Sequence, residues 1–209
     1  MATFIGDPLG VVTDDEYFDD AFDVLYGLDG DDVLRPLTPG PLTLYGGDGD
    51  DQLEGFGEED ELYGGRAADR LIGNGGDDLL EGGSGADYLM GGVDLDVLFG
   101  GTGGDVFSFL GDNSKDRVQD FNRKEGDSIE LFSSNFTALT PGEPLDPEAF
   151  FKGKNAQEED DHIGYDQVSG KMYYDENGDN PGGRILFAQF DKGTKIKVSD
   201  IDVSPLGMG

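Results

Sequence analysis

The sequence predicts an all-β protein, in which a solenoid of short strands is followed by a β-rich C-terminal segment. Seven nine-residue units follow one another without a gap, from GGDGDDQLE (46–54) to GGTGGDVFS (100–108), and an earlier copy, GLDGDDVLR, starts at Gly27. Each unit has Asp at its sixth position and Leu or Phe at its eighth. A fixed short period is typical of solenoids, in which each unit packs on its neighbours.

Each unit combines a turn with a strand. The Gly- and Asp-rich first six positions suit a tight turn, and the last three suit a very short strand whose eighth residue points inward. Two units then form one coil of eighteen residues, which gives two stacked parallel sheets over a narrow apolar core. The predicted inward column is Leu34, Leu53, Leu62, Leu71, Leu80, Leu89, Leu98 and Phe107.

Three regions are predicted along the chain. Residues 1–45 form a degenerate N-terminal cap and the first turns, in which Asp14, Asp23 and Asp32 keep the nine-residue spacing and Leu-Thr-Leu-Tyr before Gly46 suits a strand. Residues 46–108 form the regular repeats. Residues 109–209 form a β-rich C-terminal cap. The N-terminal residues are interpreted as a cap because terminal repeats must differ in order to close the stack.

Alternation of apolar and polar residues predicts the strands of the C-terminal region. Asp146-Pro147 is typical of a helix start. Tyr165, Tyr173, Tyr174, Phe187 and Phe190 are expected in the core of this sheet. The predicted strands cover 116–122, 126–131, 184–190 and 195–198, with a hairpin formed by 162–165 and 171–174.

Charge limits the possible partners. The 209 residues carry a formal net charge of −32, and residues 1–109 hold 26 acidic but only 3 basic side chains. Such a charge excludes nucleic acid and anionic membranes as expected partners, and it opposes compaction unless cations neutralise it. The first half is therefore either disordered or binds several metal ions; the unbroken apolar column favours the second alternative.

Calcium fits the repeats. Ca²⁺ takes six to eight oxygen ligands from carboxylates and backbone carbonyls, and a Gly-rich turn with a sixth-position Asp offers both. One turn cannot surround an ion, whereas two turns stacked on the same side of the solenoid can. Because loops nine residues apart lie on opposite sides, the partner loops are eighteen residues apart.

The units resemble the G-G-x-G-x-D-x-U-x repeats of RTX proteins, and three copies match fully, at 46–54, 82–90 and 100–108. DRVQDFN, GDSIELF and KMYYDENGDNPGGRILFAQF are similar to the segment that follows these repeats in serralysin-like proteins. The resemblance implies a parallel β-roll, a right-handed β-solenoid with Ca²⁺ between its turns, followed by a β-rich C-terminal cap.

The resemblance also implies the ligands, which are loop carbonyls at positions one to four and the carboxylate of the sixth-position Asp. One face would stack the loops that start at Gly27, Gly46, Gly64, Gly82 and Gly100, and the other those at Gly55, Gly73 and Gly91, giving about four to six Ca²⁺ ions. The implied ligands on the first face are Gly27, Asp29, Asp32, Gly46, Gly47, Asp48, Gly49, Asp51, Gly64, Gly65, Arg66, Ala67, Asp69, Gly82, Gly83, Ser84, Gly85, Asp87, Gly101, Gly103 and Asp105. Those on the second face are Gly55, Gly57, Asp60, Gly73, Asn74, Gly75, Gly76, Asp78, Gly92, Asp94 and Asp96.

Three loops depart from the repeat at position four, where Glu58, Ala67 and Asp94 replace Gly. If that position requires positive φ, these residues are strained there, Asp least. Weaker binding is therefore expected in the loops at Gly55 and Gly64.

The resemblance implies export by a type I secretion machinery that reads an uncleaved C-terminal signal, and hence a secreted, extracellular bacterial protein that folds when it meets Ca²⁺ outside the cell. The absence of Cys, of a cleavable N-terminal signal and of any run of eighteen apolar residues agrees with this and predicts no membrane span. The expected partners are cell-surface or extracellular polysaccharide or protein.

No catalytic function is predicted. His162 is the only His, no H-E-x-x-H motif is present, and Asp175, Asn177 and Asp179 match only the start of an EF-hand loop. One alternative is an export and folding module of a larger secreted enzyme, such as a protease, lipase or polysaccharide epimerase. Another is a small hydrolase acting through carboxylates, which needs a concave pocket with two isolated carboxylates of shifted pKa.

Overall fold

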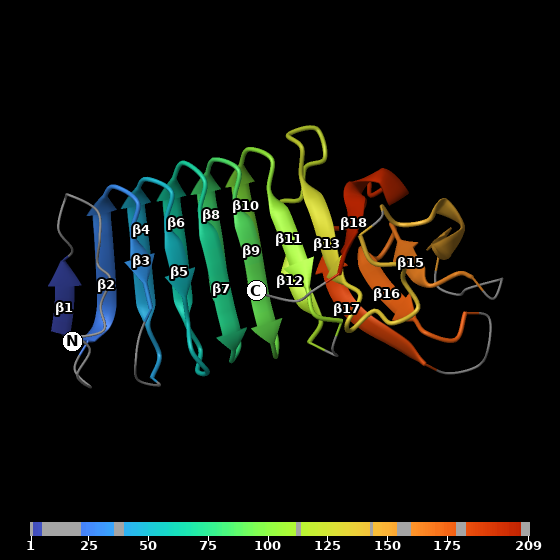
Figure 1. The fold of residues 1–209 in the computed structure, drawn as a ribbon, viewed down its shortest axis with the longest axis horizontal. Helices are drawn as coiled ribbons and strands as arrows, with labels where there is room; N and C mark the ends of the chain where they lie inside the picture. Colours follow the sequence, from blue (N-terminus) through green and yellow to red (C-terminus); the bar gives the residue numbers. More distant parts are fainter. Residues whose placement is uncertain are drawn as a thin grey trace.

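The computed structural model describes residues 2–5, 22–35, 40–111, 114–142, 144–153, 160–178 and 183–205. Within these residues the chain forms two β-sheets, whose strands lie side by side along the long axis of the molecule (Figure 1). Asp14 of the predicted N-terminal cap and Asp179 of the partial EF-hand match lie outside the described residues.

Eleven described strands form the first sheet and seven form the second. The first contains, in spatial order, β1 (Ala2–Ile5), β2 (Phe22–Asp29), β4 (Thr43–Asp48), β6 (Glu61–Arg66), β8 (Leu79–Ser84), β10 (Val97–Thr102), β12 (Asp116–Val118), β17 (Arg184–Phe190), β16 (Lys171–Asp175), β15 (Ile163–Asp166) and β14 (Phe150–Lys152). The second contains β18 (Ile201–Ser204), β13 (Ser128–Phe132), β11 (Val106–Phe109), β9 (Tyr88–Val93), β7 (Arg70–Gly75), β5 (Gln52–Glu54) and β3 (Val33–Leu34).

The strand register confirms the eighteen-residue coil. Successive repeat strands alternate between the two sheets, and each strand pairs in parallel with the strand two places along the chain. In the first sheet Leu62 pairs with Leu80, and Leu80 with Leu98. The predicted all-β parallel solenoid is therefore confirmed.

Most repeat strands are longer than the predicted three residues. β6, β8 and β10 each span six residues, because the first three positions of the next unit continue the ladder and only positions four to six form the turn. Gly65 pairs with Gly47 and with Gly83 in this extension. Gly at the second position allows the positive φ that the extension needs, which is 121° at Gly65.

The predicted apolar column is confirmed. Each of its eight side chains is at most 1 % exposed, and Leu25 and Leu44 extend it towards the N-terminal end. Full burial of a Leu side chain contributes about 1.5–3 kcal/mol, so the column is a continuous source of stability through every coil.

The C-terminal strands continue the first sheet. β17 pairs in parallel with β12 and antiparallel with β16, and β15 and β16 form the predicted hairpin. Four of the five predicted aromatic core residues are buried: Tyr165, Tyr174, Phe187 and Phe190. Tyr173 was wrongly predicted as core. Because neighbours on a strand face opposite sides, its ring is only half-buried and lies under the Arg184 guanidinium, 4.5 Å from the ring centroid.

Two elements differ from the prediction. The expected helix at Asp146 is a single 3-10 turn, Pro147–Ala149, because Phe150 and Phe151 enter β14 at once. The expected strand at 195–198 is also wrong, since Val198–Asp200 form a 3-10 turn and the strand, β18, begins at Ile201. The Asp200 carboxylate accepts the Lys197 N–H at 2.9 Å, which favours the turn at this point.

Both sheets gain further strands from residues after 108. The described repeats and the C-terminal segment therefore share the same two sheets. The division into 1–45, 46–108 and 109–209 stays a prediction. In the described part of the chain, no helix has the length and apolar character of a membrane-spanning segment.

Candidate metal centre

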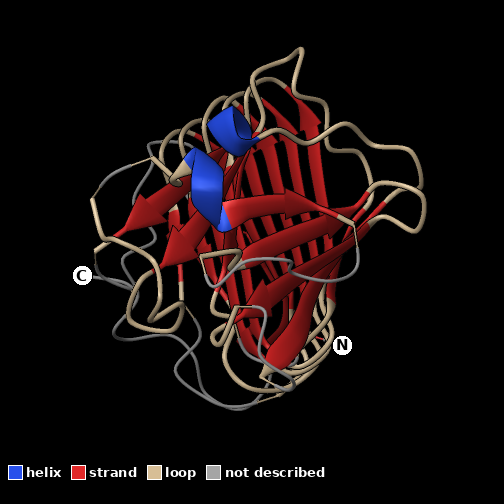
Figure 2. Ribbon diagram, turned by 90° about the vertical axis from the view of Figure 1, so that its right-hand side faces the viewer, coloured by secondary structure: helices blue, strands red, loops and turns tan. Residues whose placement is uncertain are grey.

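The turns lie in two rows along the edges of the sheets, visible when the molecule is turned to look along its long axis (Figure 2). Parallel pairing brings Leu28 next to Gly47 and Gly83 next to Gly101, so the loops that begin at Gly27, Gly46, Gly64, Gly82 and Gly100 follow one another on the first face. Asn74 pairs with Gly92, which stacks the loops at Gly73 and Gly91 on the second face.

The sixth-position Asp residues of the first face form a hydrogen-bonded ladder through the coils. The backbone N–H of each Asp donates to the carboxylate of the Asp in the next loop of the same face. The pairs are Asp32 N to Asp51 Oδ1 (2.8 Å), Asp51 N to Asp69 Oδ1 (2.8 Å), Asp69 N to Asp87 Oδ1 (2.8 Å) and Asp87 N to Asp105 Oδ1 (3.0 Å). All five side chains are at most 2 % exposed.

The second face carries the same arrangement. Asp60 N donates to Asp78 Oδ1 at 2.8 Å, and Asp78 N donates to Asp96 Oδ1 at 2.9 Å. The carboxylate of Asp60 accepts the Leu42 N–H at 2.9 Å. Both edges of the solenoid therefore hold a line of buried carboxylates inside the turns.

One oxygen of several of these carboxylates has no hydrogen-bond partner among the described residues. These buried atoms are Oδ2 of Asp51, Asp69, Asp78 and Asp87. A buried charged oxygen without a partner is costly, so it calls for a bound cation. Among the described residues, no group of three or more His, Cys, Asp or Glu side chains is placed to hold a metal ion by itself, and backbone carbonyls of the turns are the further oxygens at hand. A set of carboxylate and carbonyl oxygens suits Ca²⁺ rather than a transition metal.

The carboxylates explain why every unit begins with Gly. A Cβ on Gly82 would lie 2.5 Å from Asp87 Oδ2, and a Cβ on Gly64 would lie 2.5 Å from Asp69 Oδ2. The carboxylate of each loop thus folds back over the first residue of the same loop. A side chain at this position would displace it.

Positions two and four of the loops adopt left-handed backbone conformations. At position four this confirms the strain predicted for Ala67 (φ 75°) and Asp94 (φ 78°). The requirement at position two was missed, and it places Leu28 (φ 88°) and Asn74 (φ 75°) in the same region. Asn74 compensates in part, since its Nδ2 donates to the Gly55 carbonyl at 2.9 Å.

The loop at Gly55 folds differently from the other seven. None of its residues from Gly55 to Asp60 has a positive φ, so the strain predicted for Glu58 is wrong, and Phe56 at position two is unstrained as well. Instead, Asp60 Oδ2 accepts the Phe56 N–H at 2.9 Å within the loop. The oxygen that is left unpartnered in neighbouring loops is thus satisfied by the chain itself.

Third-position residues differ in another way. Asp29, Asp48, Arg66 and Ser84 are all exposed and end their strands, so the buried oxygens of the loops come from the sixth-position Asp rather than from these side chains. The Arg66 guanidinium pairs with Asp48 Oδ2 at 3.0 Å on the surface, where such a pair contributes little to stability.

The ladder extends beyond the repeats through residues that the prediction missed. Asp105 N donates to Asp127 Oδ1 at 3.1 Å, and Asp96 N donates to Asp116 Oδ1 at 3.3 Å. Asp120 accepts the N–H groups of Gly100 (3.0 Å) and Gly101 (2.9 Å), which closes the last repeat loop. The available signal was the D-x-U pattern of Asp116-Arg-Val and Asp127-Ser-Ile, which lacks the glycines.

Burial raises the pKa of the ladder carboxylates. Desolvation is the largest cause, and neighbouring carboxylates add to it: the pKa of Asp69 rises to about 7 and that of Asp78 to about 8. The pKa values of Asp51 and Asp87 rise to about 6, chiefly through desolvation. In the absence of metal these carboxylates are therefore protonated at higher pH than an exposed Asp.

These shifts predict that acid stabilises the calcium-free fold. Because the folded-state pKa values exceed the unfolded value of about 3.9, the carboxylates contribute stability that is fully present below that value and is lost as pH rises through 6 to 8. In excess chelator we expect more strand signal by circular dichroism at about pH 5 than at about pH 8. With Ca²⁺ present the order reverses, because the ligands must lose their protons. Equal strand signals at the two pH values in chelator would contradict the assignment.

The strained loop at Gly64 gives a second prediction. Ala67→Gly should stabilise the calcium-bound protein by about 0.5–1 kcal/mol, because Gly accepts a φ of 75° without strain. The matched control is the neighbouring Ala68→Gly, where φ is not positive and the change should instead destabilise slightly. Chemical denaturation of both variants measures the difference; a loss of stability in both would show that the strain is absent.

Comparison with protein families agrees with this geometry. A model of the RTX calcium-binding nonapeptide repeat (4 copies) matches residues 19–35, 43–71, 63–98 and 72–107. These units are RTX calcium-binding nonapeptide repeats. The RTX repeats therefore contain the stacked aspartates of both faces. The serralysin-like nature of the C-terminal segment stays a prediction.

This chain is similar to several solved structures, including a subunit of an epimerase. The solution structure of the AlgE6R3 subunit from the Azotobacter vinelandii mannuronan C5-epimerase is 23 % identical, with a TM-score of 0.47, over 70 % of this chain and 79 % of that one. A search of curated proteins found no match.

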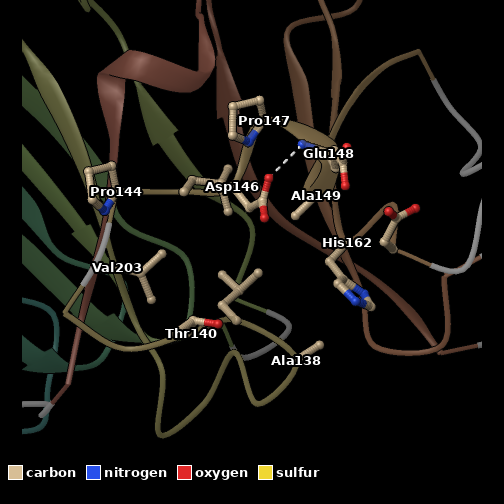
Figure 3. Close-up of a pocket in the computed structure, with 12 residues that line it drawn as sticks. Ala138, Thr140, Pro144, Asp146, Pro147, Glu148, Ala149, His162 and Val203 are labelled. Carbon is tan, nitrogen blue, oxygen red and sulfur yellow. Dashed lines mark hydrogen bonds between the residues drawn. The ribbon is translucent and has the colours of Figure 1, made fainter.

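The C-terminal cap contains a separate cavity of about 510 Å³ (Figure 3). Its rim carries the exposed carboxylates of Asp146, Glu148 and Asp160, and Asp146 Oδ1 accepts the Glu148 N–H at 3.0 Å as a helix cap. The half-buried His162 lies beside them, and its Nδ1 contacts the Asp175 carbonyl at 2.8 Å. Asp146 and His162 thus have structural partners.

Proposed function

We propose that this chain is a secreted, non-enzymatic calcium-binding protein that folds when it meets Ca²⁺ outside the cell. The observation that carries the proposal is the line of buried sixth-position carboxylates, in which Oδ2 of Asp51, Asp69, Asp78 and Asp87 has no hydrogen-bond partner within the described protein. Uncompensated, these charges oppose the fold; ions bound only by the folded form stabilise it by mass action.

The proposed ions lie between successive loops of one face. On the first face, the loops at Gly46, Gly64, Gly82 and Gly100 supply three adjacent pairs, and the loop at Gly27 supplies a fourth. On the second face we propose one ion between the loops at Gly73 and Gly91. In the loop at Gly55, the Asp60 carboxylate accepts the Phe56 N–H of the same loop, so we propose no comparable site there. About five ions are therefore expected, within the range of four to six inferred from the sequence.

Export by a type I machinery through the C-terminal region is part of the same proposal. A chain that stays unfolded at low cytosolic calcium can pass through the export channel. Extracellular calcium then triggers its folding. A cell-surface or extracellular polysaccharide or protein is the proposed partner. The acidic repeats suit this setting because calcium cancels the charge that would otherwise keep them expanded.

Circular dichroism during a calcium titration tests the proposal. In excess chelator at neutral pH we expect little strand signal, and added Ca²⁺ should restore it in one cooperative step. Mg²⁺ at the same concentration is the control and should have little effect, because it demands near-ideal octahedral geometry and dehydrates reluctantly. Full strand signal in chelator would contradict the proposal.

A further inference from the structure

A second cavity, of about 570 Å³, lies between two loops of the C-terminal half. One wall comes from the turn between β12 and β13, the other from the segment between β17 and β18. We call it the basic cavity. The residues that define it for the argument are Phe121, Arg123, Lys124, Thr194, Lys195 and Lys197.

The basic cavity is unusual in this chain because of its charge. The protein has only 14 Lys and Arg side chains and a net charge of −32, yet four of the basic side chains line this one space. No carboxylate lines it among the described residues. Clefts lined by one sign of charge concentrate ions of the opposite sign.

The three lysines are not neutralised by ion pairs. In the described structure no salt bridge involves Lys124, Lys195 or Lys197, and all three side chains are exposed. Arg123 differs, since its Nε and Nη2 bind Asp200 Oδ2 (2.9 Å) and Oδ1 (3.0 Å). The cavity therefore keeps three ammonium groups whose charge is available to a ligand.

The walls are held in place before any ligand arrives. Asp200, 7 % exposed, binds Arg123 from one wall and the Lys197 N–H from the other. Burial alone would raise the pKa of Asp200, but these partners lower it below its ordinary value, so it stays ionised. On the second wall, the Thr194 carbonyl accepts the Tyr165 hydroxyl at 2.9 Å and the Gly193 N–H binds the Gln167 carbonyl at 2.8 Å.

We propose that the basic cavity binds a small oxyanion, such as a carboxylate or sulfate group carried on a sugar or free in solution. Three flexible ammonium groups act as point charges for such a ligand, and the Thr194 side chain and the Phe121 ring can contact a sugar ring or hydroxyl. A small anion feels mainly the local field, since charges beyond about 8 Å are screened at physiological salt.

NMR titration of the calcium-loaded, ¹⁵N-labelled full chain tests this proposal. Sulfate and glucuronate are suitable probes because they stay soluble with calcium, and chloride at equal ionic strength is the control. We expect shifts that saturate at the amides of Asn122, Gly193 and Thr194 with either probe, at concentrations up to about 10 mM. Tighter glucuronate binding identifies a sugar acid, and tighter sulfate binding an inorganic oxyanion; both support the site.

The double variant Lys124→Gln and Lys195→Gln should weaken binding about tenfold while leaving the calcium-induced strand signal unchanged. The matched control, Lys152→Gln and Lys171→Gln, removes two charges elsewhere in the cap and should change the affinity less than twofold. Absence of saturable shifts at these amides, or equal affinities of the two double variants, would overturn the proposal. Neither result affects the calcium sites, which the strand signal reports separately.

Discussion

Asp87→Ala should lower the free energy of unfolding of the calcium-bound protein by about 3–5 kcal/mol and raise the calcium midpoint about tenfold. The substitution removes a carboxylate that touches two proposed sites and has an unpartnered Oδ2. It also leaves the buried Asp69 N–H, which donates to Asp87 Oδ1 at 2.8 Å, without an acceptor. Loss of such an acceptor costs about 1–3 kcal/mol by itself, and the lost ion contacts supply the rest.

The control for Asp87 is Asp77→Ala, which also removes an Asp from a turn. Asp77 is exposed, and its Oδ1 accepts only the Leu95 N–H at 2.9 Å on the surface. A cost below about 1 kcal/mol and an unchanged calcium midpoint are expected. Calcium titrations and chemical denaturation measure both variants. Equal midpoints would show that the sixth-position carboxylate is not a ligand.

Gly82→Ala should lower the free energy of unfolding nearly as much as Asp87→Ala, although it removes no carboxylate ligand. The added Cβ would meet Asp87 Oδ2 at 2.5 Å and the Asp87 Cβ and Cγ at 2.8 Å, so the carboxylate must leave its position. We expect a loss of about 2–4 kcal/mol, which combines overpacking with weakened calcium binding. The calcium midpoint therefore rises together with the loss of stability.

Gly57→Ala is the matched control for Gly82. A Cβ at Gly57 meets nothing within 4 Å, and its φ is not positive. The change should be neutral or stabilise by up to about 1 kcal/mol, through reduced entropy of the unfolded chain. If Gly82→Ala and Gly57→Ala unfold at the same denaturant concentration, the close contact between Gly82 and Asp87 does not exist in solution.

The solenoid was predictable because a period of nine fixes which residues face inward and which strands pair. Leu80 is buried and pairs with residues eighteen places away for this reason alone. The same period placed the sixth-position Asp side chains on two faces. Composition and spacing also predicted that Ala67 and Asp94 occupy strained turn positions.

Other features depend on contacts that no period encodes. The loop at Gly55 satisfies Asp60 internally, which follows from its own side chains rather than from the repeat. Asp116 and Asp127 continue the ladder from loops of different length, without the glycines that mark the other units. The basic cavity joins segments some seventy residues apart, brought together by the Arg123–Asp200 pair.

The central claim is that calcium ions lie between successive loops and are held by the sixth-position aspartates. Anomalous diffraction from crystals grown with Ca²⁺ tests it most directly. The account predicts a row of peaks along the first face, each within about 2.3–2.6 Å of a ladder carboxylate, and a peak between the loops at Gly73 and Gly91. An intact solenoid without peaks beside Asp51, Asp69 and Asp87 would contradict it.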